Sequence, residues 1–311
     1  MDNPALDNLL VYTYCQGMNL KNRSEYLSFR SMLALLGKLP PSQASSVLAG
    51  LGRFSGGILR IRRRVVEDQL GIVFPDLSAA GRGALANRIY DHLGRTVGEV
   101  FGSGMDVLVK NARIEPGWDR VDQALAFGRG AIVATGHIGN FELGGALIAS
   151  RYPLLDVVKN QRNTEFNTYL ERLRNERGIQ TVSMQQPGRA VLNHLRSGGL
   201  VSLLVDQDAG AAGIGTDFLG RPASTWPGAA RFSIRTGCPV IPMAILREGP
   251  GRHVLRISEP LEPSGLTDRP EDIISYTARI SVAVEEFIWQ NPEQWFWVHR
   301  RWKGAKAGVE S

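Results

Sequence analysis

Two ionisable side chains stand close together where an apolar run of the chain ends. The run Ala131–Thr135 is followed by a glycine, then by His137, and Glu142 comes five residues later. A histidine takes a proton from a hydroxyl most effectively when a carboxylate holds its other ring nitrogen. We therefore interpret His137 as a general base and Glu142 as the carboxylate that orients it.

The spacing of this pair restricts where a helix can begin. Five residues of a regular helix turn through about 500°, which would point the two side chains apart. His137 is therefore expected on the strand end or turn, with the helix starting near Asn140, a favoured N-cap residue. Glu142 then falls in the first helical turn, where the helix dipole favours a negative charge. The spacing also occurs by chance, so a histidine that only ends a strand remains the alternative.

A second acidic pair follows another apolar strand. Val201–Val205 ends in Asp206, Gln207 and Asp208. Two aspartates at this spacing are typical of glycosyltransferases that hold a divalent metal, and they also occur as structural strand ends. In the general-base interpretation the two carboxylates instead lie beside His137, where they orient a substrate or fix an arginine such as Arg221.

Several other catalytic patterns are missing from the sequence. It has no G-x-S-x-G nucleophile turn, no H-E-x-x-H, no P-loop and no complete dinucleotide-binding glycine motif. We therefore expect neither a serine acyl-enzyme nor a cofactor, and the general-base mechanism needs no metal.

The pattern of apolar residues predicts an α/β fold with a largely parallel central sheet flanked by helices, preceded by a helical N-terminal region. Alternating strands and helices beyond residue 116 give this architecture, and sites in such folds collect at the carboxyl ends of strands. The expected strands are Ala131–Thr135, Leu154–Val158, Gln180–Met184, Val201–Val205, Val240–Leu246 and His253–Ile257. The expected helices are Asn140–Ser150, Thr164–Arg177, Gly188–Ser197, Trp226–Thr236 and Glu271–Gln290, with amphipathic stretches at Ser42–Ile61 and Ala80–Val109.

The chain divides by composition at Pro116-Gly117. We predict a helical region at residues 1–115, attached to a membrane surface, and an α/β core at residues 116–311. The segment Asp217–Ala230 is expected as a loop that opens a helix.

Composition limits the partners. The chain has 311 residues, 43% of them hydrophobic, and a formal net charge of +6. A basic protein of this kind suits acidic partners such as anionic lipid, a phosphorylated sugar or an acidic carrier protein. No zinc-finger or RNA-recognition pattern supports a nucleic-acid partner. Cys15 and Cys238 are expected as free thiols in a reducing compartment.

The sequence predicts peripheral attachment to a membrane. It shows no basic-then-apolar signal segment at its start and no run of 18 apolar residues. The basic run Arg62–Arg64 follows the mildly apolar Ser46–Leu59 and suits anionic headgroups. A second cluster combines Trp295, Phe296, Trp297 and Trp302 with basic side chains, which suits the headgroup region or, alternatively, a buried strand.

Taken together, five blocks of the sequence resemble the late acyltransferases of bacterial lipid A biosynthesis, the lauroyl and myristoyl transferases, within the lysophospholipid acyltransferase superfamily. The blocks are the stretch around His137 and Glu142, the Asp206–Asp208 strand end, Asp217–Ala230, Thr236–Pro242, and Asn291–Lys303; Arg62–Leu70 with Phe74-Pro75 extends the similarity toward the N-terminus. The chain departs from the family in lacking an initial membrane-spanning helix.

The resemblance implies transfer of a fatty acyl chain from a thioester, on acyl-carrier protein or coenzyme A, to a hydroxyl of a membrane glycolipid such as a lipid A precursor. It also implies a place on the cytoplasmic face of the bacterial inner membrane. Arg162, Asp206, Asp208, Arg221 and Asn140 are then expected to contact substrate. Acylation of a phosphatidylinositol mannoside or another lysolipid, a metal-dependent glycosyltransferase, and a catalytically silent membrane-binding module remain alternatives.

Overall fold

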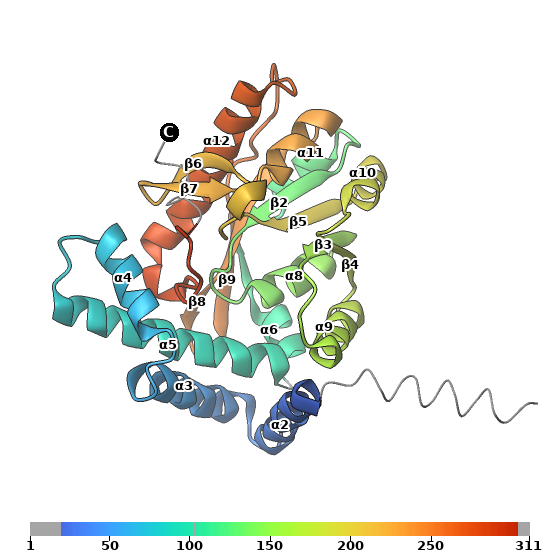
Figure 1. Cartoon of the computed structure of the whole chain (residues 1–311). Helices are drawn as coiled ribbons and strands as arrows, with labels where there is room; N and C mark the ends of the chain where they lie inside the picture. The colour runs from blue at the N-terminus through green and yellow to red at the C-terminus, as the bar shows by residue number, and fades with distance from the viewer. Residues whose placement is uncertain (1–19, 103, 304–311) are drawn as a thin grey trace, which may run out of the picture.

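The computed structural model describes residues 20–102 and 104–303, and Cys15 lies outside them. Helices α2 (Leu20–Leu36), α3 (Pro41–Gly57), α4 (Arg63–Val73), α5 (Ala79–Phe101) and α6 (Met105–Asn111) precede an α/β part (Figure 1). That part contains β1 (Arg113–Glu115), α7 (Asp119–Leu125), β2 (Ala131–Thr135), α8 (Phe141–Ala149), β3 (Leu154–Val158), α9 (Thr164–Glu176), β4 (Ile179–Ser183), α10 (Gly188–Arg196), β5 (Leu200–Leu204), η1 (Gly210–Ala212), β6 (Ile214–Phe218), β7 (Arg221–Thr225), α11 (Gly228–Thr236), β8 (Val240–Gly249), β9 (Arg252–Ile257), α12 (Pro270–Gln290) and η2 (Pro292–Gln294).

The central sheet has seven strands in the order β1-β9-β8-β2-β5-β3-β4. All neighbours pair in parallel except β8 and β9, which form an antiparallel pair. Strand β2 lies in the middle, between β5 and β8, so the residues that follow its carboxyl end lie at the centre of the sheet edge. The expected α/β fold with a largely parallel sheet is confirmed.

Alternating residues of the strands face two helical layers. Ala131 and Val133 of β2 pack in one apolar cluster with α6, α7 and α8, whereas Ile132 and Ala134 pack in another with α10, α11 and α12. Both faces of the sheet are thus covered, which explains why the strands read as nearly continuous apolar runs.

Helices α3 and α5 pack so closely that glycine is required at their contact. A Cβ atom on Gly52 would lie 2.2 Å from the carbonyl oxygen of Tyr90, and one on Gly94 would lie 2.1 Å from that of Leu48. The small residues therefore give α3 a close fit on α5. Helix α5 in turn packs on the core that contains Trp295 and Trp297, so the helical region and the α/β part share apolar contacts. The predicted division at residues 115 and 116 stays a prediction.

The C-terminal segment is packed inside the protein, which corrects the second membrane cluster expected from the sequence. Trp295 is 2% exposed, and Trp297 and Arg301 are fully buried. The side chain of Gln69 on α4 donates to the backbone carbonyls of Trp297 and His299 and accepts from the Arg301 amide. The alternation of tryptophans therefore belongs to the core.

The strand and helix predictions of the α/β part agree with the structure to within about two residues, apart from β8, which runs to Gly249. The segment Asp217–Ala230 opens a helix as expected, since α11 begins at Gly228. Its first part, expected as a loop, instead belongs to the β-hairpin β6–β7, whose turn carries the left-handed residues Leu219 and Gly220. The amphipathic stretch Ala80–Val109 is interrupted after Phe101, and α6 begins at Met105. In the part of the chain that is described, no helix combines the length and apolarity needed to cross a membrane.

Candidate active site

His137 lies directly after the central strand β2, on the turn that leads into α8. Glycines on both sides make this turn. A Cβ atom on Gly136 would lie 3.1 Å from the carboxyl carbon of Asp206, and Gly139 has a φ of +61° with Ile245 O only 1.6 Å from where a Cβ would stand. The turn is thus held against β5 on one side and β8 on the other. The His137 side chain is 23% exposed.

The carboxylate that holds His137 is Asp206, at the end of the neighbouring strand β5. Its Oδ1 lies 2.9 Å from His137 Nδ1, and its Oδ2 accepts the backbone amide of His137 at 2.7 Å. The indole of Trp295 donates to the same Oδ2 at 2.7 Å. Asp206 is 1% exposed. Burial alone would raise its pKa, but the charge and hydrogen bonds of His137 and the bond from Trp295 outweigh burial and lower the pKa of Asp206.

These contacts determine the proton arrangement of the imidazole. An ionised Asp206 only accepts hydrogen bonds, so the proton lies on His137 Nδ1 and Nε2 presents its lone pair. The side-chain amide of Gln207 lies 3.2 Å from Nε2. The rings of Phe141 and Phe296 flank the imidazole at centroid distances of 5.1 and 5.9 Å. His137 is therefore oriented for use as a base at Nε2.

The expected hydrogen bond between His137 and Glu142 is wrong. Glu142 is buried in the first turn of α8 and pairs with Arg174 of α9, whose Nε donates to Oε2 at 3.2 Å while its Nη2 contacts Oε1. Helix α8 starts where it was expected, but the Glu142 carboxylate contacts α9. Asp206, which follows β5, is the carboxylate beside the imidazole. What Glu142 does in the reaction stays a prediction.

Asn140 is the N-cap of α8, as expected, and its side-chain oxygen accepts the Leu143 amide at 3.1 Å. Its side chain is fully buried, and its amide nitrogen donates to Glu99 of α5 at 2.9 Å. Glu99 is itself paired with Arg247 and lies 3.2 Å from His253. Burial would raise the pKa of Glu99, but these cationic and hydrogen-bonding neighbours lower it to about 2. Asn140 is thus occupied by protein contacts on both sides of its amide.

The backbone amides of the turn are also engaged. Gly139 N donates to Gln294 O at 2.9 Å, and Asn140 N donates to Ile245 O at 3.3 Å. The N–H groups of Gly139 and Asn140 therefore already have acceptors within the protein.

The other expected substrate residues lie at different distances from this centre. Asp208 follows Gln207 on the same loop, and its amide donates to His299 Nε2 at 3.2 Å. Arg162 is exposed on the loop after β3. Arg221 is exposed on β7 and donates to the Ile72 carbonyl at 3.0 Å, so the expected contact of Arg221 with the acidic pair is replaced by one with α4.

The acidic pair is poorly suited to holding a metal. Both oxygens of Asp206 already accept hydrogen bonds from His137 and Trp295. Within residues 20–102 and 104–303, His, Cys, Asp and Glu side chains form no group of three or more that could hold a metal ion. A divalent ion at Asp206 would have to displace the partner of the base.

Four residues of this centre were missed by sequence reasoning: Gln207, Trp295, Glu99 and Arg174. Gln207 stood between the two predicted aspartates, so the same motif contained the signal. The other three come from distant elements, and only the packing of the chain brings them to the turn.

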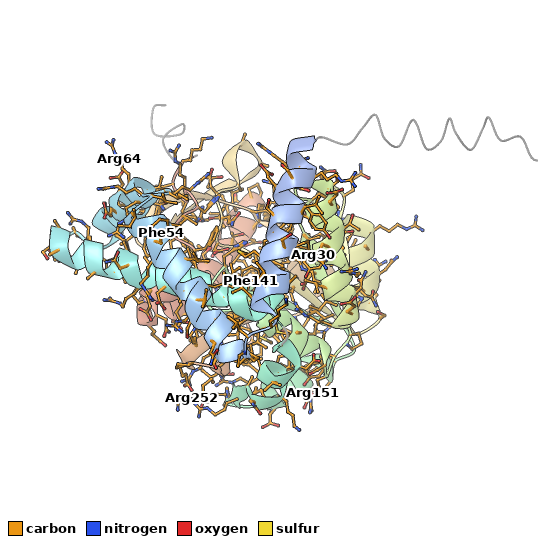
Figure 2. All side chains as sticks on the ribbon, turned by 90° about the horizontal axis from the view of Figure 1, so that it is seen from below. Arg30, Phe54, Arg64, Phe141, Arg151 and Arg252 are labelled. Atoms are coloured by element: carbon orange, nitrogen blue, oxygen red, sulfur yellow. The ribbon has the colours of Figure 1, made fainter. Side chains whose placement is uncertain are left out.

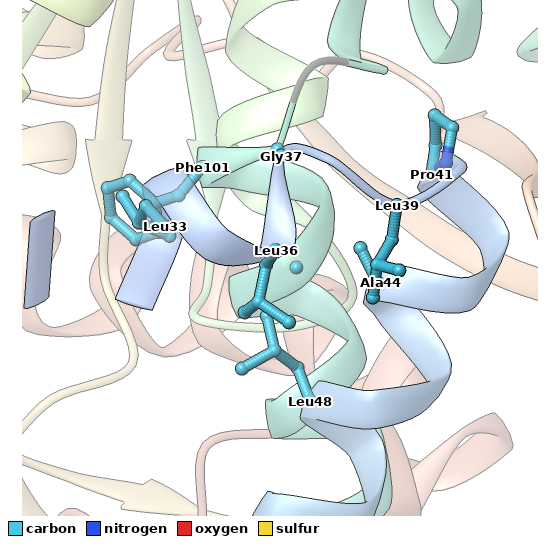
Figure 3. A pocket seen from close by; sticks show the side chains of 10 residues that line it. Leu33, Leu36, Gly37, Leu39, Pro41, Ala44, Leu48 and Phe101 are labelled. Atoms are coloured by element: carbon cyan, nitrogen blue, oxygen red, sulfur yellow. The ribbon is translucent and has the colours of Figure 1, made fainter. Parts of the chain in front are cut away.

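An apolar pocket lies apart from this centre, where α2, α3 and α5 meet (Figure 3). Leu36, Leu48 and Phe101 are among its walls, and its volume is about 10 Å³. That space holds about one water molecule. The pocket is therefore too small for an acyl chain in this arrangement.

Comparison with known proteins shows the family of this chain. The family model described as bacterial lipid A biosynthesis acyltransferase matches residues 25–304. The chain belongs to this family. The resemblance that the sequence blocks indicated is thereby confirmed.

Relatives in the family fall into two groups by name. A phosphatidylinositol mannoside acyltransferase of Mycobacterium tuberculosis is 29% identical over 144 residues, and this match spans 45% of the present chain and 46% of that relative, about half of its length. The lipid A biosynthesis lauroyltransferase of Escherichia coli is 23% identical over 90% of the present chain and 92% of its own. A phosphatidylinositol mannoside acyltransferase of Mycolicibacterium smegmatis is 25% identical, with 89% and 90% covered.

A solved structure, the 1-acyl-sn-glycerophosphate acyltransferase of Thermotoga maritima, covers 78% of this chain and 96% of its own at 16% identity. The TM-score is 0.28, which is too low to support an argument about the site.

Proposed function

We propose that this protein is an O-acyltransferase that moves a fatty acyl chain from a thioester to a hydroxyl of a membrane glycolipid. The observation that carries the proposal is the pair of His137 and buried Asp206, with Nδ1 held at 2.9 Å and the His137 side chain 23% exposed. A base prepared in this way, in a chain of this family, suits the activation of an acceptor hydroxyl.

The proposed reaction uses the imidazole twice. His137 Nε2 takes the proton of the acceptor hydroxyl while the oxygen attacks the thioester carbonyl carbon. The tetrahedral adduct then breaks its carbon–sulfur bond, and the imidazolium returns the proton to the thiolate, so an ester and a free thiol are formed. Asp206 stabilises the imidazolium between these steps. Trp295 and the His137 amide hold Asp206 in place.

The proposed donor is acyl-carrier protein or acyl-coenzyme A, both of which carry negative charge that suits a chain of net charge +6. The proposed acceptor is a lipid A precursor, in keeping with the lauroyltransferase relative, which matches over nearly the whole chain. A phosphatidylinositol mannoside is the alternative acceptor, because two relatives carry that name.

We place the acceptor at a membrane surface on the evidence of α3. Its outer side and its C-cap residue form an exposed apolar stripe. The stripe consists of Val47, Leu51, Phe54 and the C-cap Ile58, which are 44%, 47%, 48% and 72% exposed. The spacing of four, three and four residues puts all of them on one side of a helix. Figure 2 views the molecule from this side, with α2 and α3 in front and Phe54 on the near face. A helix of this kind suits the interface between headgroups and acyl chains.

Basic residues follow the apolar stripe along the chain, although not all are exposed as the sequence predicted. Arg60 and Arg64 are exposed, but Arg63 is only 8% exposed and binds Glu67, Asn87 and the Gly83 carbonyl. The expected basic run is therefore corrected: Arg63 stabilises the packing of α4 on α5. We propose attachment to anionic lipid at the cytoplasmic face of the bacterial inner membrane.

One assay tests the proposed function. The purified protein is mixed with acyl-carrier-protein and coenzyme A thioesters and, in separate reactions, with a lipid A precursor, a phosphatidylinositol mannoside and a lysophospholipid. We expect an acylated glycolipid by mass spectrometry and its loss in His137→Ala. Failure with every pair of substrates, by protein that is folded and bound to vesicles, would contradict the proposal.

A further inference from the structure

Both ring nitrogens of His137 are held by consecutive residues of one loop. Asp206 binds Nδ1 at 2.9 Å, and the side-chain amide of Gln207 lies 3.2 Å from Nε2. The reactive nitrogen of the base is therefore occupied in the protein without substrate.

The direction of the second hydrogen bond follows from the first. The carboxylate of Asp206 accepts, so Nδ1 carries the ring proton and Nε2 offers only its lone pair. The amide nitrogen of Gln207 must then donate to Nε2. An acceptor hydroxyl that is to be deprotonated has to donate to the same lone pair, because a nitrogen of this kind has only one.

The backbone of the loop Asp206–Asp208 is held by hydrogen bonds. Replacement of the Gln207 amide by a substrate hydroxyl at His137 Nε2 would therefore move only the Gln207 side chain. Asp208 N donates to His299 Nε2 at 3.2 Å, and Asp206 is locked by Trp295. Asp206 and His299 are the titratable neighbours of His137, and His299 in turn lies near the charges of Asp208 and Arg301. Burial lowers the pKa of His299, which keeps its Nε2 available as an acceptor. Gln207 is only partly buried.

We propose that Gln207 is a further residue of the reaction centre: its amide occupies the acceptor-hydroxyl position on His137 Nε2 and keeps water from it until the acceptor displaces the amide. This inference rests on the proposed acyl transfer. It deepens that function by adding a shield for the donor thioester. Without the shield, a water bound at Nε2 would give its proton to the imidazole and add as hydroxide to the thioester carbonyl. The carbon–sulfur bond would then break, releasing a free fatty acid and, after the proton returns, a free thiol.

The test compares Gln207→Ala with wild type in two assays on the full chain. Thioester hydrolysis without acceptor should rise about two- to tenfold, which is the factor expected when one ordinary hydrogen bond no longer competes for Nε2. The KM for the acceptor should fall by a similar factor, while kcat of transfer stays within about threefold. A variant that was merely damaged would lose both reactions together.

Two further variants sharpen the comparison. Gln207→Leu fills the same space without donating, so hydrolysis should stay close to the wild-type rate while the acceptor KM still falls. Gln186→Ala, an exposed glutamine on the loop after β4, is the matched control and should leave both reactions unchanged. Unchanged hydrolysis in Gln207→Ala, or a loss of kcat above about 100-fold, would overturn the proposal.

A measurement that needs no turnover separates this proposal from the proposed function. The ¹⁵N NMR resonance of His137 Nε2 in the substrate-free protein should move in Gln207→Ala and stay in place in Gln186→Ala. A resonance that does not respond would show that Gln207 does not bind the base, whatever the enzyme acylates. Wild-type protein that turns over no thioester, with a resonance that does respond, would instead count against the acyl-transfer proposal.

Discussion

The turn at His137 and the contact between α3 and α5 are built on opposite principles. Around the turn, buried polar groups satisfy one another: Asp206 accepts three hydrogen bonds from His137 and Trp295, and Asn140 uses both ends of its amide. At the helix contact the close fit comes from glycine, because Gly52 and Gly94 let the backbones touch. One ion pair, Arg53 with Asp91, joins the two helices, and Val47, Leu51 and Phe54 of α3 are exposed.

This contrast indicates what each region is built to do. Buried hydrogen bonds fix directions, which a general base needs, because a displaced imidazole loses its alignment with the reacting hydroxyl. Close helix packing fixes only the position of α3 and leaves its apolar stripe available for a surface. Substitutions in the first region should therefore change catalysis or stability sharply, and substitutions in the second should change where the protein is found.

The largest effect is expected from Asp206→Asn. The amide can donate to Nδ1, which favours the tautomer with the proton on Nε2 and leaves no lone pair for the hydroxyl. We expect kcat to fall about 10³–10⁴-fold, within the range for lost general-base function, with the fold preserved by circular dichroism. Combining it with His137→Ala should be scarcely worse than His137→Ala alone, since the pair acts as a unit.

Asp217→Asn is the matched control for this substitution. Asp217 is exposed on β6, and its replacement should leave kcat unchanged. Near-native turnover in Asp206→Asn would show that this carboxylate does not orient the base.

Glu142→Gln should reveal the other carboxylate as chiefly structural. The side chains of Arg174 and Glu142 are 15% and 9% exposed, so the substitution removes one charge of a buried pair and leaves the charge of Arg174 uncompensated by Glu142. Breaking such a pair costs about 3–5 kcal/mol of the free energy of unfolding. Urea unfolding measures this loss, and Glu176→Gln, which touches only the exposed pair with Arg172, should cost less than about 0.5 kcal/mol.

A stable Glu142→Gln protein with the turnover of Asp206→Asn would reverse this assignment. Glu142 would then belong to the catalytic pair that the sequence predicted.

The apolar stripe gives the test of the second region. Phe54→Ser with Ile58→Ser removes two partly exposed apolar side chains and should weaken binding to anionic vesicles about 10–100-fold. Transfer to an acceptor dispersed in detergent should continue. Sedimentation with vesicles measures the change.

The control replaces two other exposed apolar residues, Ile274→Ser with Val282→Ser on α12, and should bind as wild type does. If both double variants bind vesicles equally, α3 is not the attached face. Replacing Arg60 and Arg64 by serine should make vesicle binding less dependent on salt, while binding itself continues.

The same contrast explains how much the sequence could predict. The bounds of β2 and β3 were predicted without error, because apolar runs between glycines and polar residues indicate buried strands directly. Asn140 was also correctly identified as a cap from its type and position. These features depend on neighbours along the chain.

Features that depend on neighbours in space were predicted less well. Glu142 is closer to His137 in sequence than Asp206, but the parallel pairing of β2 with β5 brings Asp206 beside the imidazole. The tryptophans near the C-terminus suit a membrane interface by composition, and only the packing of α4 and α5 on them shows that they are core. Sequence therefore predicted the position of His137 at the edge of the sheet, while the partner of its imidazole required the fold.

The smallest effect that we predict is a pH dependence of stability that originates on the polar side. Asp156 of β3 is half-buried, with its Oδ1 atom enclosed. Burial of the carboxyl group, followed by the nearby charge of Glu142, raises the pKa of Asp156 to about 7, although Arg174 and the Ser202 hydroxyl act in the opposite direction. A carboxyl group with a raised pKa holds its proton longer in the folded protein than in the unfolded chain. Its contribution to stability is therefore complete below pH 3.8, the ordinary value, and is lost as the pH rises through about 7.

Asp156→Asn removes this titration. Wild type loses stability as Asp156 ionises, whereas the variant does not. The free energy of unfolding of the variant should therefore gain about 1–2 kcal/mol over that of wild type as the pH rises from about 5 to about 8, measured by urea unfolding across that range. Asp268→Asn, an exposed aspartate in the loop before α12, should follow the wild-type curve. If Asp156→Asn also runs parallel to wild type, the buried charges beside α8 do not set the pH response. The polar and apolar regions would then differ in catalysis and attachment but not in their sensitivity to pH.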